Sequence, residues 1–237
     1  MTTKELVHEI TSYCISNADA ESVKKSQRFF KEEFVGYGLS APQIHSKVKE
    51  MLKRGNFDLP TVLEAMPLLL KGGMYEEISM GLLLLDGLWK QFSPETFQTI
   101  DSWFSFGITN WAHADTLAMF ILPRFLDKKI LEMSDFSPWL TSPYKFQRRC
   151  APVTLIKHMK RTRQVMPSIL FVEKLMTDTE REVHQGMGWF LREAWKISSA
   201  ETESFLEKHK DTAPRLIIQY ACEKMTAENK LRFKQAK

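Results

Sequence analysis

The sequence predicts an all-α protein, a curved solenoid of stacked antiparallel helical hairpins that resemble HEAT-like repeats. Apolar residues recur at spacings of three and four along nearly the whole chain, which is the period of an amphipathic helix. Gly and Pro number only ten each in 237 residues, few for an all-β protein of this size. Successive hairpins would repeat every ~35–45 residues, the range of HEAT-like repeats.

The expected helices follow one another with short breaks. They cover residues 4–15, 22–34, 43–54, 59–70, 75–92, 94–108, 110–126, 142–161, 166–177, 181–197, 202–210 and 213–225. The breaks "GYGLSAP", "RGNFDLP", "KGG", "SSAET" and "KDTAP" supply turns, with Pro, Ser, Thr or Asp where helices should begin. Short turns between consecutive helices favour antiparallel hairpins. Because no Pro/Gly/Ser-rich linker divides the chain, we expect one domain over residues 1–237.

Several functional classes have no support in the sequence. The first residues lack the apolar core of a signal peptide, and the longest apolar stretch, "MGLLLLDGLW", is too short to span a bilayer. Cys14, Cys150 and Cys222 form no C-x-x-C pair, which disfavours a disulfide framework or a zinc site. There is no phosphate-binding loop, dinucleotide fingerprint or G-x-S-x-G motif. We therefore expect a cytoplasmic protein that needs no metal or cofactor and does not enter a membrane.

Charge is distributed unevenly. Residues 136–172 contain no Asp or Glu but seven basic residues: Lys145, Arg148, Arg149, Lys157, Lys160, Arg161 and Arg163. One interpretation is an ordinary solvated face, which the modest net charge of +4 allows. The other is a surface for a polyanion such as nucleic acid.

The stretch "TNWAHADTLAMF" places Trp111 and Asp115 four positions apart, with Asn110 as the expected helix cap. Side chains at this spacing share one helix face, so ring and carboxylate should stand side by side. An aspartate near a helix N-terminus is also favoured by the helix dipole alone. The pair by itself therefore does not distinguish a site from helix-end chemistry.

The stretch "HQGMGWFLREAWKI" predicts a helix on which the indole of Trp189 shares a stripe with charged residues. Met187, Phe190, Leu191 and Ala194 form the apolar stripe, which leaves Trp189, Arg192, Glu193 and Lys196 on the polar one. Gly186 and Gly188 weaken a helix by about 1 kcal/mol each relative to Ala, a cost that close approach of another group would explain. The alternative is that Trp189 simply packs on a neighbouring helix.

Taken together, "NWAHAD", "QRRCA" and "GMGWFLREAWK" resemble the AlkD-type DNA alkylation-repair glycosylases, and "QRFFKEEFVGYGLSAPQ" is similar to that family's first hairpin. The resemblance implies a HEAT-like solenoid whose concave basic face holds duplex DNA. It also implies excision of cationic alkylated purines such as N3-alkyladenine and N7-alkylguanine.

By resemblance, Asp115 takes the place of the catalytic aspartate, with Trp111 and Trp189 as the aromatic walls. Arg149 takes the place of the DNA-facing arginine if "RCA" follows the family pattern, whereas alignment on Gln147 selects Arg148. The expected DNA-binding residues are Arg148, Arg149, Lys157, Lys160, Arg161, Arg163, Arg192, Phe29 and Ser40. The chain departs from the family at Ala112, where relatives have an aspartate, at Phe29, where they have tyrosine, and at Ser40, where they have glutamine.

The chemistry suits these residue types. Alkylation makes the purine cationic, so it leaves without protonation while positive charge develops on the sugar. A carboxylate stabilises that charge, and indole faces attract the cation. We therefore expect a monomeric enzyme whose partner is double-stranded DNA carrying alkylated bases, held near the nucleoid by that DNA. The alternative is a HEAT-like module that binds nucleic acid or protein without catalysis.

Overall fold

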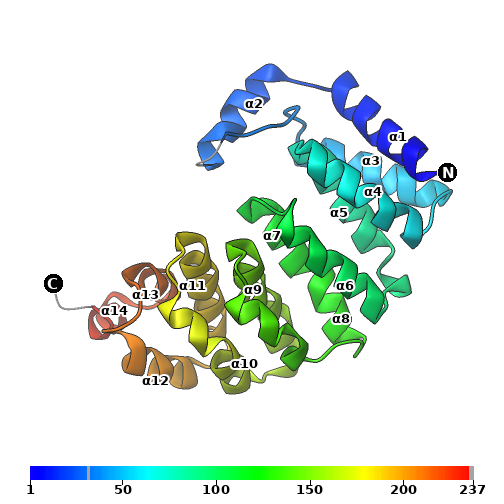
Figure 1. The fold of residues 1–237 in the computed structure, drawn as a ribbon. Coiled ribbons are helices and arrows are strands. Elements are labelled where there is room, and N and C mark those ends of the chain that lie inside the picture. The colour runs from blue at the N-terminus through cyan, green and yellow to red at the C-terminus, as the bar shows by residue number, and fades with distance from the viewer. Residues whose placement is uncertain (31–32, 235–237) are drawn as a thin grey trace. The chain divides into compact units, whose positions relative to one another are not determined.

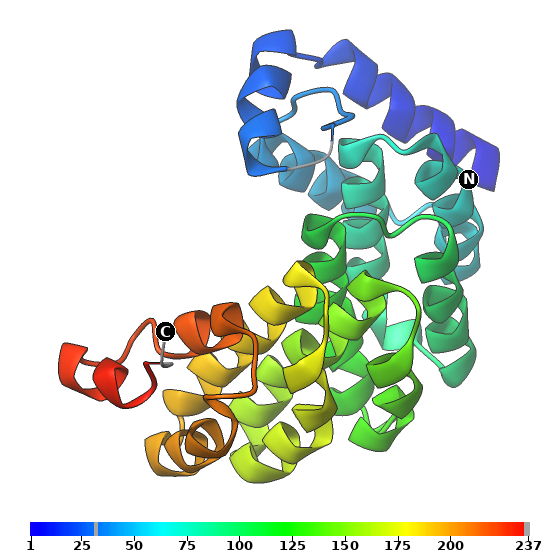
Figure 2. The ribbon, with the colours of Figure 1, turned by 60° about the vertical axis from the view of Figure 1, so that its left-hand side comes forward.

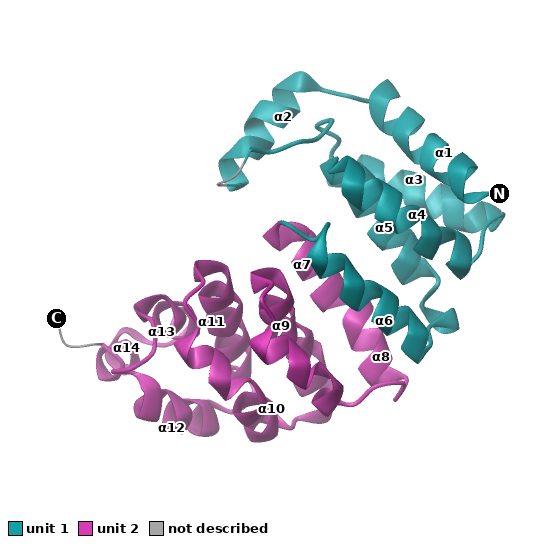
Figure 3. Cartoon of the chain, in the orientation of Figure 1, with its two compact units in different colours: residues 1–109 teal, residues 110–237 magenta. Residues whose placement is uncertain are grey.

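The structure is a computed structural model that describes residues 1–30 and 33–234. Within these residues the chain is helical and contains no β-strand, which confirms the predicted fold class. The chain divides into two compact units, residues 1–109 and 110–237 (Figure 3). The prediction of a single domain stays a prediction, and each unit is described by itself.

Unit 1 holds the first half of the helices. They are α1 (Thr3–Ser16), α2 (Ala20–Ser26), η1 (Gln27–Phe29), α3 (Ala41–Arg54), α4 (Leu59–Gly72), α5 (Tyr75–Gly87), η2 (Trp89–Gln91), α6 (Pro94–Ser102) and η3 (Trp103–Ser105). Helix α5 packs against α1, α3 and α4 (Figure 1). The buried side chains of these helices are mostly apolar, as with Ile10, Met66 and Met80, but Glu76 and Glu77 of α5 are buried as well.

One predicted helix of unit 1 is wrong at its C-terminal end. The helical period over residues 22–34 continues past α2 and η1, but Phe30 and Phe34 are not helical; residues 31 and 32 lie outside the described part. The backbone N–H of Phe34 donates to the Gln27 side chain at 2.7 Å, and the Phe30, Phe34 and Tyr75 rings cluster with centroids 5.1–5.7 Å apart. This aromatic packing across the unit outweighs the local helical pattern.

Unit 2 contains the remaining elements. They are α7 (Trp111–Thr116), η4 (Leu117–Ile121), α8 (Leu122–Asp127), η5 (Met133–Thr141), α9 (Lys145–Thr162), α10 (Val165–Val172), η6 (Glu173–Thr177), α11 (Arg181–Trp195), α12 (Ser199–His209), α13 (Arg215–Ala221) and α14 (Ala227–Arg232). The sequence pattern did not indicate η5 or α14, and several predicted helices end earlier, in short 3-10 turns.

Four helical segments of unit 2 form one layer. The segment α7–η4–α8 packs on α9, α9 on α11, and α11 on α13 (Figures 1 and 2). The segment α7–η4–α8 runs in the same direction as α9, because Asp115 and Asp127 meet Arg149 and Arg161 in order along α9. Helix α11 runs the same way, because Gly186 and Glu193 meet Arg149 and Lys160 in order. Helices α10 and α12 pack on each other and return the chain between members of this layer. The N-termini of α7, α9 and α11 therefore lie at the same end of the layer.

The segment α7–η4–α8 is one helix with a wide turn in the middle. In η4, a π-helix, the backbone N–H of Leu122 donates to the carbonyl of Leu117, five residues earlier. Pro123 explains the widening, since it has no N–H for the carbonyl of residue 119 and its ring would collide with that carbonyl in a regular α-helix. Such turns often accompany functional sites.

The two glycines of α11 allow close packing on both sides of the helix. A Cβ at Gly186 would come within 3.0 Å of the Arg149 side chain. A Cβ at Gly188 would lie 2.4 Å from Cβ of Tyr220 and 2.9 Å from the carbonyl oxygen of Ile217. The close approach that the sequence suggested is therefore an approach of α9 and α13 to α11 within the protein.

Gly188→Ala is expected to destabilise unit 2, because the backbone of α13 cannot yield as a flexible side chain would. Overpacking of this kind costs about 1–3 kcal/mol. Chemical unfolding of both proteins measures the loss. Gly72→Ala, at a helical glycine with no atom nearer than 3.8 Å to the new Cβ, is the control and should be neutral or slightly stabilising. Equal stability of the Gly188 variant and the wild type would contradict this account.

No helix in the described part of the chain is both long and apolar enough to cross a membrane.

Candidate functional site

Helix α7 begins as the sequence predicts. The Asn110 side chain accepts from the backbone N–H of His113 at 2.9 Å, which caps the helix. Trp111 is the first helical residue and is 39% exposed, while Asp115 stands one turn later. His113, on the opposite face, is buried, and its Nδ1 lies 2.9 Å from the Asn110 amide nitrogen. The cap thus fixes the start of the helix on which the ring and the carboxylate stand one turn apart.

The Asp115 carboxylate forms a bidentate ion pair with Arg149 of α9. The Nε and Nη2 atoms of Arg149 donate to Oδ1 and Oδ2 of Asp115 at 2.8 and 2.7 Å. The Arg149 side chain is 7% exposed and the Asp115 side chain 16%. Two parallel charge-assisted bonds fix the plane of the carboxylate. Each oxygen keeps further lone-pair positions, and solvent reaches part of the group.

Arg149 also connects to α11. Its Nη1 donates to the carbonyl of Glu182 at 2.6 Å, and its aliphatic part passes over Gly186. Trp189 lies one turn beyond Gly186 and is partly exposed. One guanidinium, from α9, therefore links the two helices that carry the candidate residues: α7 with Trp111 and Asp115, and α11 with Trp189. The reason for a glycine at 186 was not visible in the sequence, because it depends on this packing.

Arg148 has a different partner. Its Nε and Nη2 donate to the Asp178 carboxylate at 2.6 and 3.2 Å, and its Nη1 donates to the carbonyl of Ser142 at 2.7 Å. Asp178 also accepts from the backbone N–H of Glu180. Arg148 thus ties the loop before α9 to the loop before α11. Of the two arginines that the sequence left open, Arg149 is the one beside Asp115.

The basic stretch is largely neutralised by carboxylates from outside it. Besides Arg148 and Arg149, the ion pairs join Lys145 to Glu180 and Glu182, Lys160 to Glu193, and Arg161 to Asp127. Lys157 lies with its ammonium 4.7 Å from the centroid of the Phe120 ring, and Arg163 is exposed. A stretch that lacks acids along the sequence is therefore not an uncompensated basic surface in space. Contact of these residues with DNA stays a prediction.

Glu193, which the sequence assigns to the polar stripe of its helix, is not exposed to solvent. Glu193 is buried against α9, where Oε2 pairs with Lys160 and Oε1 with Lys196, each at 2.6 Å. Arg192 is partly exposed and pairs with Glu223. Burial raises the pKa of Glu193, but the two ammonium groups outweigh it and hold the pKa below the ordinary 4.5. A carboxylate with two such partners can be buried where an unpaired one cannot.

The Glu193 pairs should contribute pH-dependent stability. Since the pKa of Glu193 is lowered in the folded state, the pairs contribute to the free energy of unfolding above about pH 4.5. This contribution is lost as the pH falls through the folded-state pKa. The difference in unfolding free energy between wild type and Glu193→Gln should therefore be largest near neutral pH and shrink in acid. Urea unfolding at several pH values measures it, and a difference that does not vary with pH would contradict the ion pairs.

Unit 1 contains two predicted DNA-binding residues, Phe29 and Ser40, which lie on different elements. Phe29 ends η1 and its ring is exposed. Ser40 precedes α3, and both its backbone N–H and its hydroxyl donate to Oε1 of Gln43, at 2.8 and 2.6 Å. Ser40 thus helps to cap α3.

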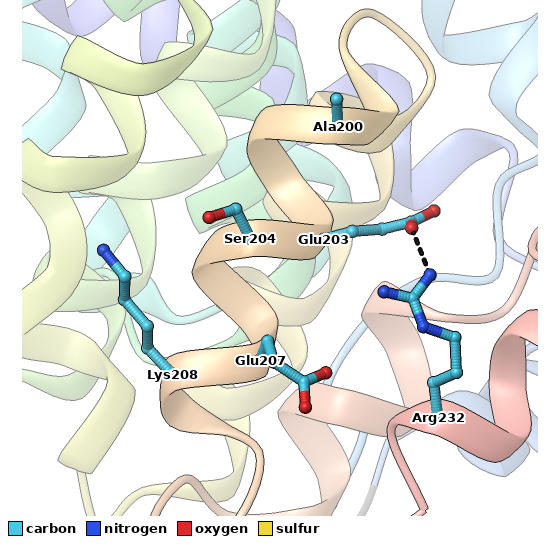
Figure 4. Close-up of a pocket in the computed structure, with 6 residues that line it drawn as sticks. All are labelled: Ala200, Glu203, Ser204, Glu207, Lys208 and Arg232. Carbon is cyan, nitrogen blue, oxygen red and sulfur yellow. Dashed lines mark hydrogen bonds and ion pairs between the residues drawn. The ribbon is translucent and has the colours of Figure 1, made fainter.

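A metal site and a surface hollow are two alternatives to this site. Among residues 1–30 and 33–234, no group of three His, Cys, Asp or Glu side chains is placed to hold a metal ion. An open hollow lies on α12 and α14; Figure 4 shows its lining by Ala200, Glu203, Ser204, Glu207, Lys208 and Arg232. Glu203 there accepts from Arg232 at 2.7 Å and from Trp195 Nε1 at 2.9 Å. These bonds fasten α14 to α12 and α11.

Comparison with known proteins identifies the family. Residues 12–225 match the family described as DNA alkylation repair enzyme. The chain belongs to this family. A solved structure of a predicted DNA alkylation repair enzyme from Enterococcus faecalis has the same fold, with a TM-score of 0.76 and 17% identity over 89% of this chain and 97% of that one. No curated protein matches the sequence.

Membership of the DNA alkylation repair enzyme family gives the protein a role in DNA repair, with DNA as its partner. The resemblance on which the sequence-based prediction rested is confirmed. Sequence reasoning missed two features: the ion pair between Asp115 and Arg149, and the burial of Glu193. Both depend on partners more than 30 residues away, although an acid-free stretch of basic residues beside acid-bearing helices was a signal.

Proposed function

We propose that this member of the DNA alkylation repair enzyme family is a glycosylase that hydrolyses the N-glycosidic bond of cationic alkylated purines in duplex DNA. One observation carries the proposal: a partly exposed carboxylate, Asp115, is fixed in orientation by Arg149 and stands one turn from the exposed indole of Trp111. The substrate class follows from the charge that these groups can stabilise.

Asp115 acts on the sugar. N3- or N7-alkylation leaves the purine positively charged, so the bond to C1′ breaks heterolytically and the base departs neutral with both bonding electrons. The positive charge then resides on the sugar as an oxocarbenium ion, and water adds at C1′ and loses a proton. A preoriented carboxylate stabilises the cation and can accept a hydrogen bond from the attacking water.

Trp111 and Trp189 supply aromatic surface for the cationic base. A cation over an indole gains about 0.5–2 kcal/mol, depending on how far it is desolvated. Arg149 positions the carboxylate, because its two parallel charge-assisted bonds fix the plane of the group. Since the Arg149 guanidinium is occupied by Asp115 and Glu182, its part in the reaction is orientation.

The test is base release from a duplex that carries N7-methylguanine, with purified protein in excess. The glycosylase predicts free N7-methylguanine together with abasic sites in equal amount. The alternative function is a repair protein that binds DNA without excision. The observation behind it is that the Asp115–Arg149 pair fastens α7 to α9, a structural role that needs no reaction. Binding without release would support that alternative and refute the glycosylase.

A further inference from the structure

A second cluster of charged side chains lies on α9 and α11, beyond the candidate site. At its centre is the buried Glu193 carboxylate, with Lys160 on one oxygen and Lys196 on the other at 2.6 Å each. Arg192 Nε lies 3.6 Å from the same Oε1 that pairs with Lys196. Three cations therefore surround one carboxylate that has almost no contact with solvent.

The cluster carries a surplus of positive charge. Arg192 also pairs with Glu223, and Glu223 pairs with Lys224 at 3.0 Å. The complete set of side chains is Lys160, Arg192, Lys196 and Lys224 against Glu193 and Glu223, four positive charges against two negative. A network that served stability alone would gain nothing from two uncompensated charges held close together, since like charges repel.

The lysines remain accessible although they are anchored. The side chains of Lys160 and Lys196 are 49% and 42% exposed, whereas that of Glu193 is 8% exposed. An ammonium group has three N–H donors, so a bond to Glu193 leaves donors for another acceptor. Burial of the carboxylate beneath the lysines places a fixed anchor on the inside and two exposed cations on the outside.

The cluster is in line with the candidate site. Gly186 of α11 stands beside Arg149 of α9, and Glu193 stands beside Lys160, so both contacts join the same two parallel helices. Seven residues of α-helix separate Gly186 from Glu193, a rise of about 10 Å at 1.5 Å per residue. A DNA strand advances ~3.4 Å per nucleotide, so a strand that ran along α11 would cover this span in roughly three nucleotides.

We infer that Lys160 and Lys196, gathered by Glu193, form a seat for a backbone phosphate of the DNA strand, a few nucleotides from the base held at Asp115. This inference rests on the proposed function for the identity of the bound strand. Binding of a phosphate at this seat does not distinguish one DNA sequence from another. It sets the register of the duplex, as phosphate contacts generally do. Glu193 is a positioning residue in it, because it acts only through the two lysines.

The experiment measures the salt dependence of binding. The variant Lys160→Gln/Lys196→Gln and the wild type are titrated with an undamaged duplex over a range of KCl concentrations. Each phosphate that the protein neutralises contributes about 0.9 to the slope of log K against log salt, so loss of this one phosphate seat should lower the slope by roughly 0.9. Lys174→Gln/Lys208→Gln, two exposed lysines on η6 and α12, is the control that removes the same charge.

The expected result is a lower slope for the first variant and an unchanged slope for the control. Equal slopes for wild type and Lys160→Gln/Lys196→Gln, or an equal fall in both variants, would overturn the seat. Single-turnover release of N7-methylguanine at saturating DNA is measured in parallel. Absence of release by the wild type would refute the glycosylase and leave the seat standing, whereas release with an unchanged slope would refute the seat alone.

Discussion

Asp115→Asn is expected to slow the release of N7-methylguanine by about 10²–10³-fold, while affinity for DNA stays unchanged or improves slightly. The amide keeps the size of the carboxylate but loses the negative charge that stabilises the oxocarbenium ion. Removal of one well-placed electrostatic stabiliser typically costs this much, about 3–4 kcal/mol in activation free energy. Single-turnover kinetics with protein in excess isolate the excision step from binding.

The structure makes a control necessary for this variant. Asp115 is the partner of Arg149, so the amide also weakens an ion pair and should lower the melting temperature. Asp178→Asn is a matched control, because Asp178 makes the corresponding bidentate pair with Arg148 on the same helix. Both variants should melt earlier, but only Asp115→Asn should lose excision per folded molecule. Excision by Asp115→Asn at the wild-type rate would show that the carboxylate is merely structural.

Arg149→Gln is expected to lose both stability and activity. Breaking a buried pair on one side leaves the other charge without compensation, at a cost of about 3–5 kcal/mol. The freed Asp115 carboxylate is no longer held in its plane, and misplacement by about 1 Å can cost 10²-fold in rate. Thermal melts and single-turnover excision at a temperature where the variant is folded measure the two losses separately.

Arg148→Gln is the comparison that distinguishes the two adjacent arginines. Arg148 binds Asp178 and the carbonyl of Ser142, so its loss should destabilise the protein but leave excision per folded molecule near the wild-type rate. Neither variant should reduce the salt slope of DNA binding, because both guanidinium groups are paired inside the protein and, unlike the lysines that pair with Glu193, their side chains are largely buried. A lower slope for Arg149→Gln, with excision unaffected, would identify Arg149 as a phosphate ligand and contradict its positioning role.

Most helices were predictable because their causes are local. The period of three and four identifies α1, α3, α4 and α11, and Asn110 is a recognisable cap for α7. The pairing of Trp111 with Asp115 on one face also follows from helical spacing alone. The end of the helix that begins at α2 was not predictable, since the packing of Phe34 against Tyr75 decides it.

The ion-pair partners of the charged side chains, in contrast, could not be predicted from local sequence. The sequence by itself determined an all-helical protein, placed Trp111 beside Asp115, and left two candidates for the DNA-facing arginine, Arg149 as the preferred one and Arg148 as the alternative. Only the tertiary structure decided between these arginines, brought acids from α7, α8 and α11 onto the basic residues of α9, and buried Glu193 beneath two lysines. The physical reason is range. Helix periodicity and capping act within a few residues, whereas an ion pair joins atoms about 3 Å apart in space and more than 30 residues apart in the chain.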